Sequence, residues 1–177
     1  MAGQKNPVVA LLRAQLKSAH EVLEGTIAGV TPDQAHWKPA GRAVPIGASY
    51  AHIATGEDYL INGILRGGTM LFASAWAGKV GVSEPPPQAG EWADWARRVK
   101  VDLPAVKAYS QAVYQAADSY LATLSDADLE RQCDMSGFGM GQQPASTVCS
   151  MAVEHASWHT GEISSVKGLQ GLQGYPF

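Results

Sequence analysis

The stretch VCSMAVEHASWHTGEISSV, residues 148–166, decides how this chain folds and where its chemistry lies. Residues spaced three or four apart form one face of it: Val148, Ala152, His155, His159, Ile163 and Val166. Because an α-helix has 3.6 residues per turn, this spacing predicts a helix, which we expect to begin at Pro144 or Ser146 and to end near Gly168. Its two histidines lie in the middle of an otherwise apolar face, where their ring nitrogens need partners.

Outward from this stretch, three more segments have helical periodicity. We expect helices over about 7–29, where Asn6 and Pro7 form a start signal, over 45–65, and over 91–124. Proline disfavours helix at the residue before it, so Pro104 predicts a break near 102–103. Four long helices predict an all-α four-helix bundle with long connecting loops, formed as a single domain over residues 1–177.

The connections between these helices are expected to be mostly irregular. Residues 31–39 should form only a short helix, and residues 125–128 a capped turn. We expect the segment 69–90 to be a long loop with a helical turn around 72–77. Such a loop is either functional or only a connection between helices. Residues 131–143 are polar and glycine-rich and also read as loop, and we expect no strand of useful length.

Composition excludes several classes of protein. The net charge is −3, hydrophobic residues make up 46% and charged residues 16%, and no basic run exceeds Arg97–Arg98. We therefore expect no nucleic-acid partner and no membrane association. No apolar stretch reaches the roughly 20 residues of a membrane span, and no signal peptide is visible, so we expect a soluble, cytoplasmic protein. Cys133 and Cys149 form no Cys-x-x-Cys pattern and read as buried or idle thiols.

The pair His155 and His159 is the sharpest chemical signal. Residues four apart on a helix have Cβ atoms about 5–6 Å apart, so both rings can bind one metal ion. Ala156 stands where the zincin protease motif has glutamate, so that motif is absent. His52, on the inward face of the 45–65 helix, is the candidate third ligand. Spacing alone leaves open that these are hydrogen-bonded core histidines.

Other residues are weaker candidates. Glu162 shares the face of the histidine pair and could orient a ligand, act as a general base or be a fourth ligand, or it is a solvated glutamate. His20 and His36 fit no pattern and are assigned to the surface or to local hydrogen bonds. Glu57 and Tyr59 are more often surface or core residues. Four aromatic residues could line a pocket mouth or simply pack in the core: Trp76, Trp92, Trp95 and Tyr109.

Two segments carry a resemblance to a known family. The first is HWKP at 36–39, followed by VPIG at 44–47 and AHI at 51–53; the second is VEHASWHTGEI at 153–163. They are similar to the Trp-x-Pro segment, the Ser-Ile-Gly-like helix start, the first ligand histidine and the His-x-x-x-His-Arg-Gly-Gln-Ile helix of the DinB/YfiT-like superfamily of metalloenzymes. The order of the two segments agrees with the family, and so does the expected helix layout.

The resemblance implies a four-helix bundle, often a homodimer, with a metal ion held by three histidines. Carried over position by position, these are His52, His155 and His159. Two positions depart from the family pattern: Thr160 stands where many members have arginine, and Glu162 where many have glutamine. The departures leave the ligands untouched and put in doubt any anchoring of an anionic substrate or thiol by that arginine.

The resemblance also implies an activity. Three imidazoles suit Zn²⁺, Ni²⁺, Fe²⁺ or Co²⁺ and leave positions open for water or a substrate thiolate. We expect a metal-dependent thiol S-transferase, isomerase or hydrolase that acts on a small molecule, with a low-molecular-weight thiol as cofactor. Two alternatives stay open, a non-catalytic metal- or ligand-binding bundle that acts as a sensor or in a stress response, and an inert bundle with packed histidines.

Overall fold

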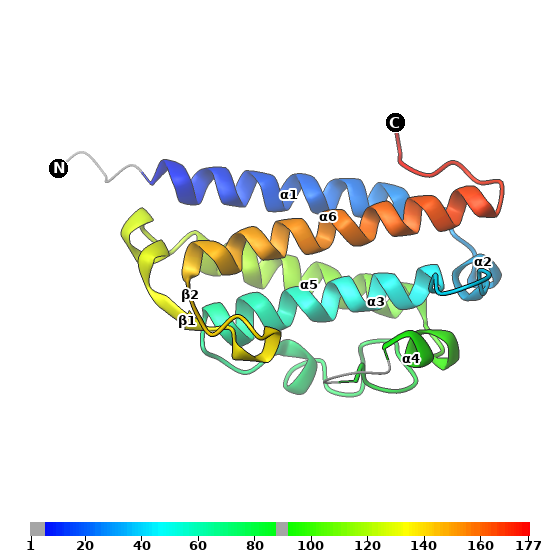
Figure 1. Ribbon diagram of the computed structural model, residues 1–177, viewed down its shortest axis with the longest axis horizontal. Coiled ribbons are helices and arrows are strands. Elements are labelled where there is room, and N and C mark those ends of the chain that lie inside the picture. Colours follow the sequence, from blue (N-terminus) through cyan, green and yellow to red (C-terminus); the bar gives the residue numbers. More distant parts are fainter. Residues whose placement is uncertain (1–5, 88–91) are drawn as a thin grey trace.

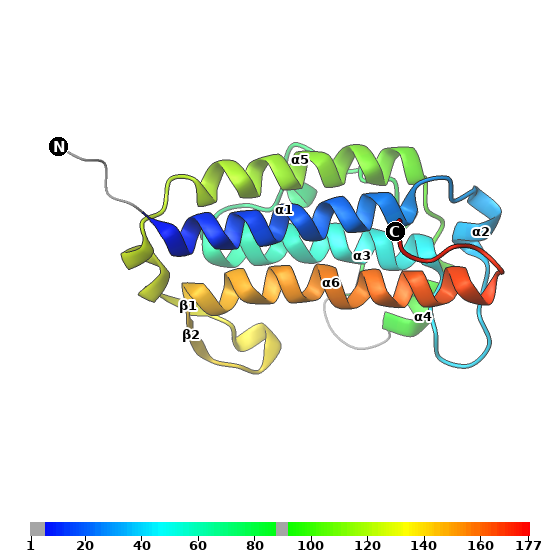
Figure 2. The same ribbon diagram turned by 90° about the horizontal axis from the view of Figure 1, so that it is seen from above.

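The computed structural model describes residues 6–87 and 92–177 and confirms the all-α bundle (Figure 1). Its long rods are α1 (Pro7–Ile27), α3 (Ile46–Glu57) continued by η1 (Asp58–Leu65), α5 (Leu103–Leu121) and α6 (Ala145–Leu169). The short elements are α2 (Pro32–His36), η2 (Leu71–Ala73), α4 (Trp92–Arg98), η3 (Asp126–Glu130), β1 (Gln132–Asp134), η4 (Ser136–Phe138) and β2 (Gln142–Pro144). Helices α1 and α6 run in one direction and α3 and α5 in the other, with α5 along one edge and α6 along the other (Figure 2). Long connections join the rods, as expected.

The start signals in the sequence lie where the helices begin. Helix α1 has proline in its first turn, and Thr31 and Gln34 form a reciprocal capping box at the start of α2. The break predicted before Pro104 is present, because α4 ends at Arg98 and the Asp102 side chain accepts a hydrogen bond from the Ala105 backbone at the start of α5. The predicted start at Glu91 lies outside the described residues.

The segment predicted as a helix over 45–65 is helical from Ile46 onward, but it changes from an α-helix to a π-helix along its length. From Asp58 to Leu65 it is a π-helix, and the Arg66 N–H donates to the carbonyl of Ile61, five residues back, at 2.9 Å. The change begins at a buried carboxylate, that of Asp58, which accepts hydrogen bonds from the backbone of Leu71 and Phe72. This residue therefore holds the first part of the 69–90 connection against the rod. Inserted π turns occur often near functional sites.

The interpretation of residues 131–143 as plain loop was wrong. Strands β1 and β2 pair in an antiparallel hairpin, with Cys133 opposite Gln143. Each strand has only three residues, which is too short to show the alternating pattern by which a strand is recognised. Two of the glycines in the connection, Gly139 and Gly141, have φ of 72° and 64°, and this left-handed conformation lets the chain reverse.

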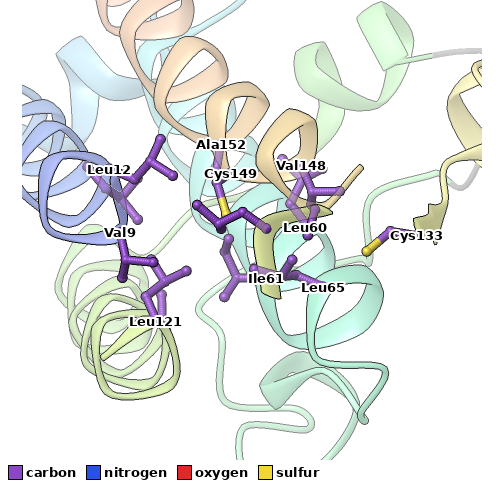
Figure 3. Packing of buried hydrophobic residues seen from close by; sticks show 14 of the residues in the cluster. Val9, Leu12, Leu60, Ile61, Leu65, Leu121, Cys133, Val148, Cys149 and Ala152 are labelled. Atoms are coloured by element: carbon purple, nitrogen blue, oxygen red, sulfur yellow. The ribbon is translucent and has the colours of Figure 1, made fainter. Parts of the chain in front are cut away.

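The core is filled by the inward faces of the four rods. One half, at the hairpin end, joins Val9 and Leu12 of α1, Ile61 of η1, Leu121 of α5 and Val148 of α6 (Figure 3). The thiols of Cys133 and Cys149 are buried and unpaired with each other, as expected. Within 6–87 and 92–177, none of the helices combines the length and the hydropathy that crossing a membrane requires.

Candidate metal centre

Three histidines from two neighbouring helices lie together, as the family resemblance implied. His52 lies in the middle of α3, and His155 and His159 lie one turn apart on α6, which packs along α3. One nitrogen from each ring can be chosen so that all three lie within 4.8 Å of one another. The ring centroids are 4.5 to 4.8 Å apart. Helix α3 thus provides His52 as the third histidine beside His155 and His159 of α6.

One pair of these nitrogens has a spacing that fits a shared metal ion. The Nε2 atoms of His52 and His155 are 3.0 Å apart. With metal–nitrogen bonds of 2.0–2.1 Å, two imidazoles on one ion have their nitrogens about 2.9 Å apart at a right angle and about 3.3 Å apart at a tetrahedral angle. The observed distance lies inside this interval, so the cluster is compatible with binding one divalent ion. The same distance is also that of a hydrogen bond between the two rings, as expected for packed histidines.

The surroundings keep two of the rings neutral. Burial and, to a smaller degree, the nearby His159 lower the pKa of His52 to about 4. Burial, followed by the neighbouring rings of His52 and His159, lowers the pKa of His155 to about 3. Near neutral pH both rings are therefore neutral, which is the protonation state in which histidine binds a metal ion.

Glu162 contacts the third ring. Its Oε2 lies 2.7 Å from Nδ1 of His159, and because a carboxylate only accepts, Nδ1 carries the proton. Nε2 of His159 is then the nitrogen left to bind a metal, which is the usual arrangement of a carboxylate behind a ligand histidine. The Glu162 side chain is 57% exposed and, in the described part of the chain, is not a member of the ligand cluster. The geometry thus favours the orienting role over that of a fourth ligand.

The aromatic residues do not form one set. The centroid of the Trp92 ring lies 4.1 Å from that of the His52 ring, and Trp92 stacks on Trp95, which is fully buried. Trp76 instead packs against Tyr109, whose hydroxyl donates to Asp58 at 2.7 Å. Only Trp92 of these four contacts the histidine cluster through its ring, while Trp95 and Tyr109 are core residues.

The assignment of His20 to the surface or to a local hydrogen bond was wrong. Its Nε2 lies 2.7 Å from Oε2 of Glu57, 37 residues away, and its ring stacks on Tyr114 at 3.6 Å. The Glu57 side chain is almost fully buried. A contact between two helices leaves no spacing pattern along the chain, so no sequence motif indicates this pair.

His36 has one local and one distant partner. Its Nδ1 lies 2.7 Å from the carbonyl of Pro32, as the local interpretation expected. Its Nε2 accepts from the backbone of Val101, which ties α2 to the segment before α5. Tyr59, another weak candidate, is exposed and packs on Phe138, outside the cluster.

Comparison with known proteins agrees with this fold. The chain matches the DinB superfamily over residues 15–163. Among solved structures it is similar to one described as a conserved protein of locus from Enterococcus faecalis, with a TM-score of 0.78 and 23% identity. That match covers 92% of this chain and 96% of the other, and it speaks for the fold alone. None of the curated proteins compared with the chain matches it.

Proposed function

The chain belongs to the DinB superfamily, and we propose that it is a metal-dependent enzyme in which His52, His155 and His159 hold one divalent ion. One observation supports this above all, the meeting of three ring nitrogens within 4.8 Å of one another. Two of the rings are also held neutral by burial. A set of imidazoles favours Zn²⁺, Ni²⁺, Fe²⁺ or Co²⁺ over the harder cations that prefer oxygen.

We propose that the reaction is transfer of a low-molecular-weight thiol to a small electrophilic molecule. Isomerisation and hydrolysis of a small molecule are the alternative reactions. When bound, the ion would supply Lewis acidity that makes a thiol or water a better nucleophile. In the transfer, a sulfur–carbon bond forms, the leaving group departs with the electron pair of its own bond, and the thiol proton passes to a base. Glu162 holds His159 in place, and its exposed carboxylate is the candidate base.

Thr160 limits how the thiol or substrate is recognised. It occupies the position at which many relatives have arginine, and it is buried with its hydroxyl donating to the Ala156 carbonyl at 2.6 Å. Its side chain is thus bound within α6 and provides no positive charge. We therefore propose that the thiol or substrate is bound without a cation at this place, unlike in arginine-bearing relatives.

The first experiment measures metal content. Protein purified without an affinity tag should contain close to one metal ion per chain by elemental analysis, and His155→Ala should contain none. His36→Ala is the matched control, since His36 lies outside the cluster and should leave metal content unchanged. Wild-type protein that neither retains nor takes up a stoichiometric ion would contradict the proposal and favour packed histidines.

The second experiment tests turnover. Metal-loaded protein is incubated with 1-chloro-2,4-dinitrobenzene and with cysteine, glutathione or coenzyme A in turn, and free thiol is followed over time. We expect thiol to be consumed faster with the wild type than with His155→Ala. Stoichiometric metal without turnover for any pair would instead support the non-catalytic binding bundle.

We further propose that the enzyme works as a homodimer in the cytoplasm, where small thiols are kept reduced. Bundles of this kind can pair through the outer faces of their helices. Light scattering at micromolar concentration should give a mass near twice that of the 18.7 kDa chain. A mass of one chain would contradict the dimer and leave the metal proposal standing.

A further inference from the structure

Gly56 is the place where the ring of His155 contacts α3. This glycine lies one turn after His52 on the same rod. A Cβ added to Gly56 would lie 2.6 Å from Cε1 of His155 and 3.2 Å from each of its ring nitrogens. All three are atoms of the ring, so the imidazole lies directly over the backbone of α3 in space that any other residue would fill.

The backbone at Gly56 gives no other reason for glycine. The residue lies in the last turn of α3, where the π-helix continues the chain, and its φ is not in the left-handed region, so alanine would fit the conformation. In such a position glycine is unfavourable relative to alanine by about fivefold in the unfolding equilibrium constant. A residue that opposes its local structure in this way is expected where a site needs it.

We propose that Gly56 is a positioning residue for His155. Because it has no side chain, the α6 ring can lie against α3, and this position brings the Nε2 atom of His155 to 3.0 Å from that of His52. Any side chain here would push the ring away and separate the two nitrogens. The inference builds on the proposed function, since it concerns the geometry of that same ligand set.

The first test needs no metal. Thermal unfolding is measured in the presence of a chelator for the wild type, Gly56→Ala, His155→Ala and the double variant. With His155 present, Gly56→Ala should lower the melting temperature, because the new methyl group meets the ring. Without the ring, the same substitution should raise the melting temperature by about 2–4 °C through its helix propensity.

The test compares the change in stability that Gly56→Ala causes in the presence of His155 with the change that it causes in His155→Ala. A difference above about threefold in the unfolding equilibrium constant supports contact between residues 56 and 155, and a smaller one overturns it. If Gly56→Ala alone fails to fold, recovery of a folded protein on adding His155→Ala supports the inference. Failure of the double variant to fold where His155→Ala folds overturns it.

The second test measures the ligand geometry with Co²⁺ alone. Titration followed by visible absorption should show at least tenfold weaker binding for Gly56→Ala and an altered band pattern. Gly63→Ala is the matched control, because it lies further along the same rod and its Cβ would meet the ring of Tyr59 at 3.2 Å. Gly56→Ala binding Co²⁺ like the wild type overturns the positioning role. If the wild type binds no Co²⁺, the proposed function fails, and the metal-free cycle still decides the contact.

Discussion

At the scale of single residues, burial determines how the histidine cluster responds to acid. An imidazole that is largely shielded from water resists protonation because the charged form loses its hydration. The folded pKa values of about 4 for His52 and about 3 for His155 lie below the 6.5 of an exposed histidine. Between these values the unfolded chain binds protons that the folded chain does not.

The metal-free protein should therefore lose stability as the pH falls from about 6.5 towards 4. The unfolded state binds more protons in this window, so the free energy of unfolding rises with pH there, by on the order of a few kcal/mol for the two rings together. Urea unfolding followed by circular dichroism, in chelator, measures the profile. His155→Ala should flatten it, and equal slopes for the two proteins would contradict this explanation.

The contact between Glu162 and His159 should set metal affinity. Glu162→Gln removes the charge that holds the ring, and loss of such partners weakens metal binding by about 10–100-fold. Since Glu162 is 57% exposed, we expect the lower end, about tenfold. Competition with a chromophoric chelator measures the affinity, with Glu154→Gln, an exposed glutamate of the same helix, as control. Equal losses for both variants would indicate a general effect of charge instead.

Among single residues, the sequence predicted those contacts that arise from spacing along one helix. His155 and His159 are four apart on one helix, and this spacing marked them as a possible pair of ligands. The inward face of its helix made His52 a candidate, and the resemblance to the DinB superfamily joined it to the pair. The pair His20 and Glu57 could not, because its members come from different helices with no shared motif.

At the scale of elements, Asp58 joins three parts of the bundle. Its carboxylate accepts hydrogen bonds from Asn62 in the π-helix, from the backbone of Leu71 and Phe72 in η2, and from Tyr109 of α5. Burial and the neighbouring carboxylate raise the pKa of Tyr109 above its usual range, so its hydroxyl stays a donor. Burying a charge is tolerable only with such partners.

Removing one of these partners should destabilise the protein. Tyr109→Phe should lower the free energy of unfolding by about 1.5–3 kcal/mol, the usual effect of losing a hydrogen bond to a charged group. Tyr120→Phe, in the same helix, loses a 3.3 Å bond to the carbonyl of Leu65 and should cost about 1 kcal/mol or less. Urea unfolding compares the two. Equal losses would mean that the buried charge makes no difference.

The sequence predicted where the helices begin, but not where an α-helix changes to a π-helix. Proline and capping residues act on their immediate neighbours, so the starts of α1, α2 and α5 follow from the sequence. The π-helix begins at Asp58, whose carboxylate binds the backbone of Leu71, 13 residues further on, and the hairpin consists of two paired strands of three residues each. Both are tertiary effects that periodicity does not record.

At the scale of the whole molecule, the cluster links α3 to α6. Binding to the folded state alone stabilises it by about 2.7 kcal/mol when the free ligand is at 100 times its dissociation constant. For a chain of this size that energy corresponds to a rise in melting temperature of about 5–10 °C. We expect Zn²⁺ or Ni²⁺ to raise the melting temperature of the wild type by this amount in scanning calorimetry. His155→Ala should show no rise, and an equal rise would mean that the ion binds elsewhere.

The bundle itself was the most predictable feature. Four apolar stripes of helical period can bury their faces only against one another, which leaves few other arrangements. What periodicity could not supply was the order in which the rods pack, and hence which face of α3 meets α6.

The indole that lies on His52 gives the protein an intrinsic optical signal. The Trp92 ring is 4.1 Å from that imidazole, so a paramagnetic ion such as Ni²⁺ or Co²⁺ arriving there should quench its ultraviolet emission. Trp92→Phe should abolish most of the quenching, and persistence of the full signal would assign it to another tryptophan. Stopped-flow fluorimetry could then time the arrival and departure of the ion without any attached dye.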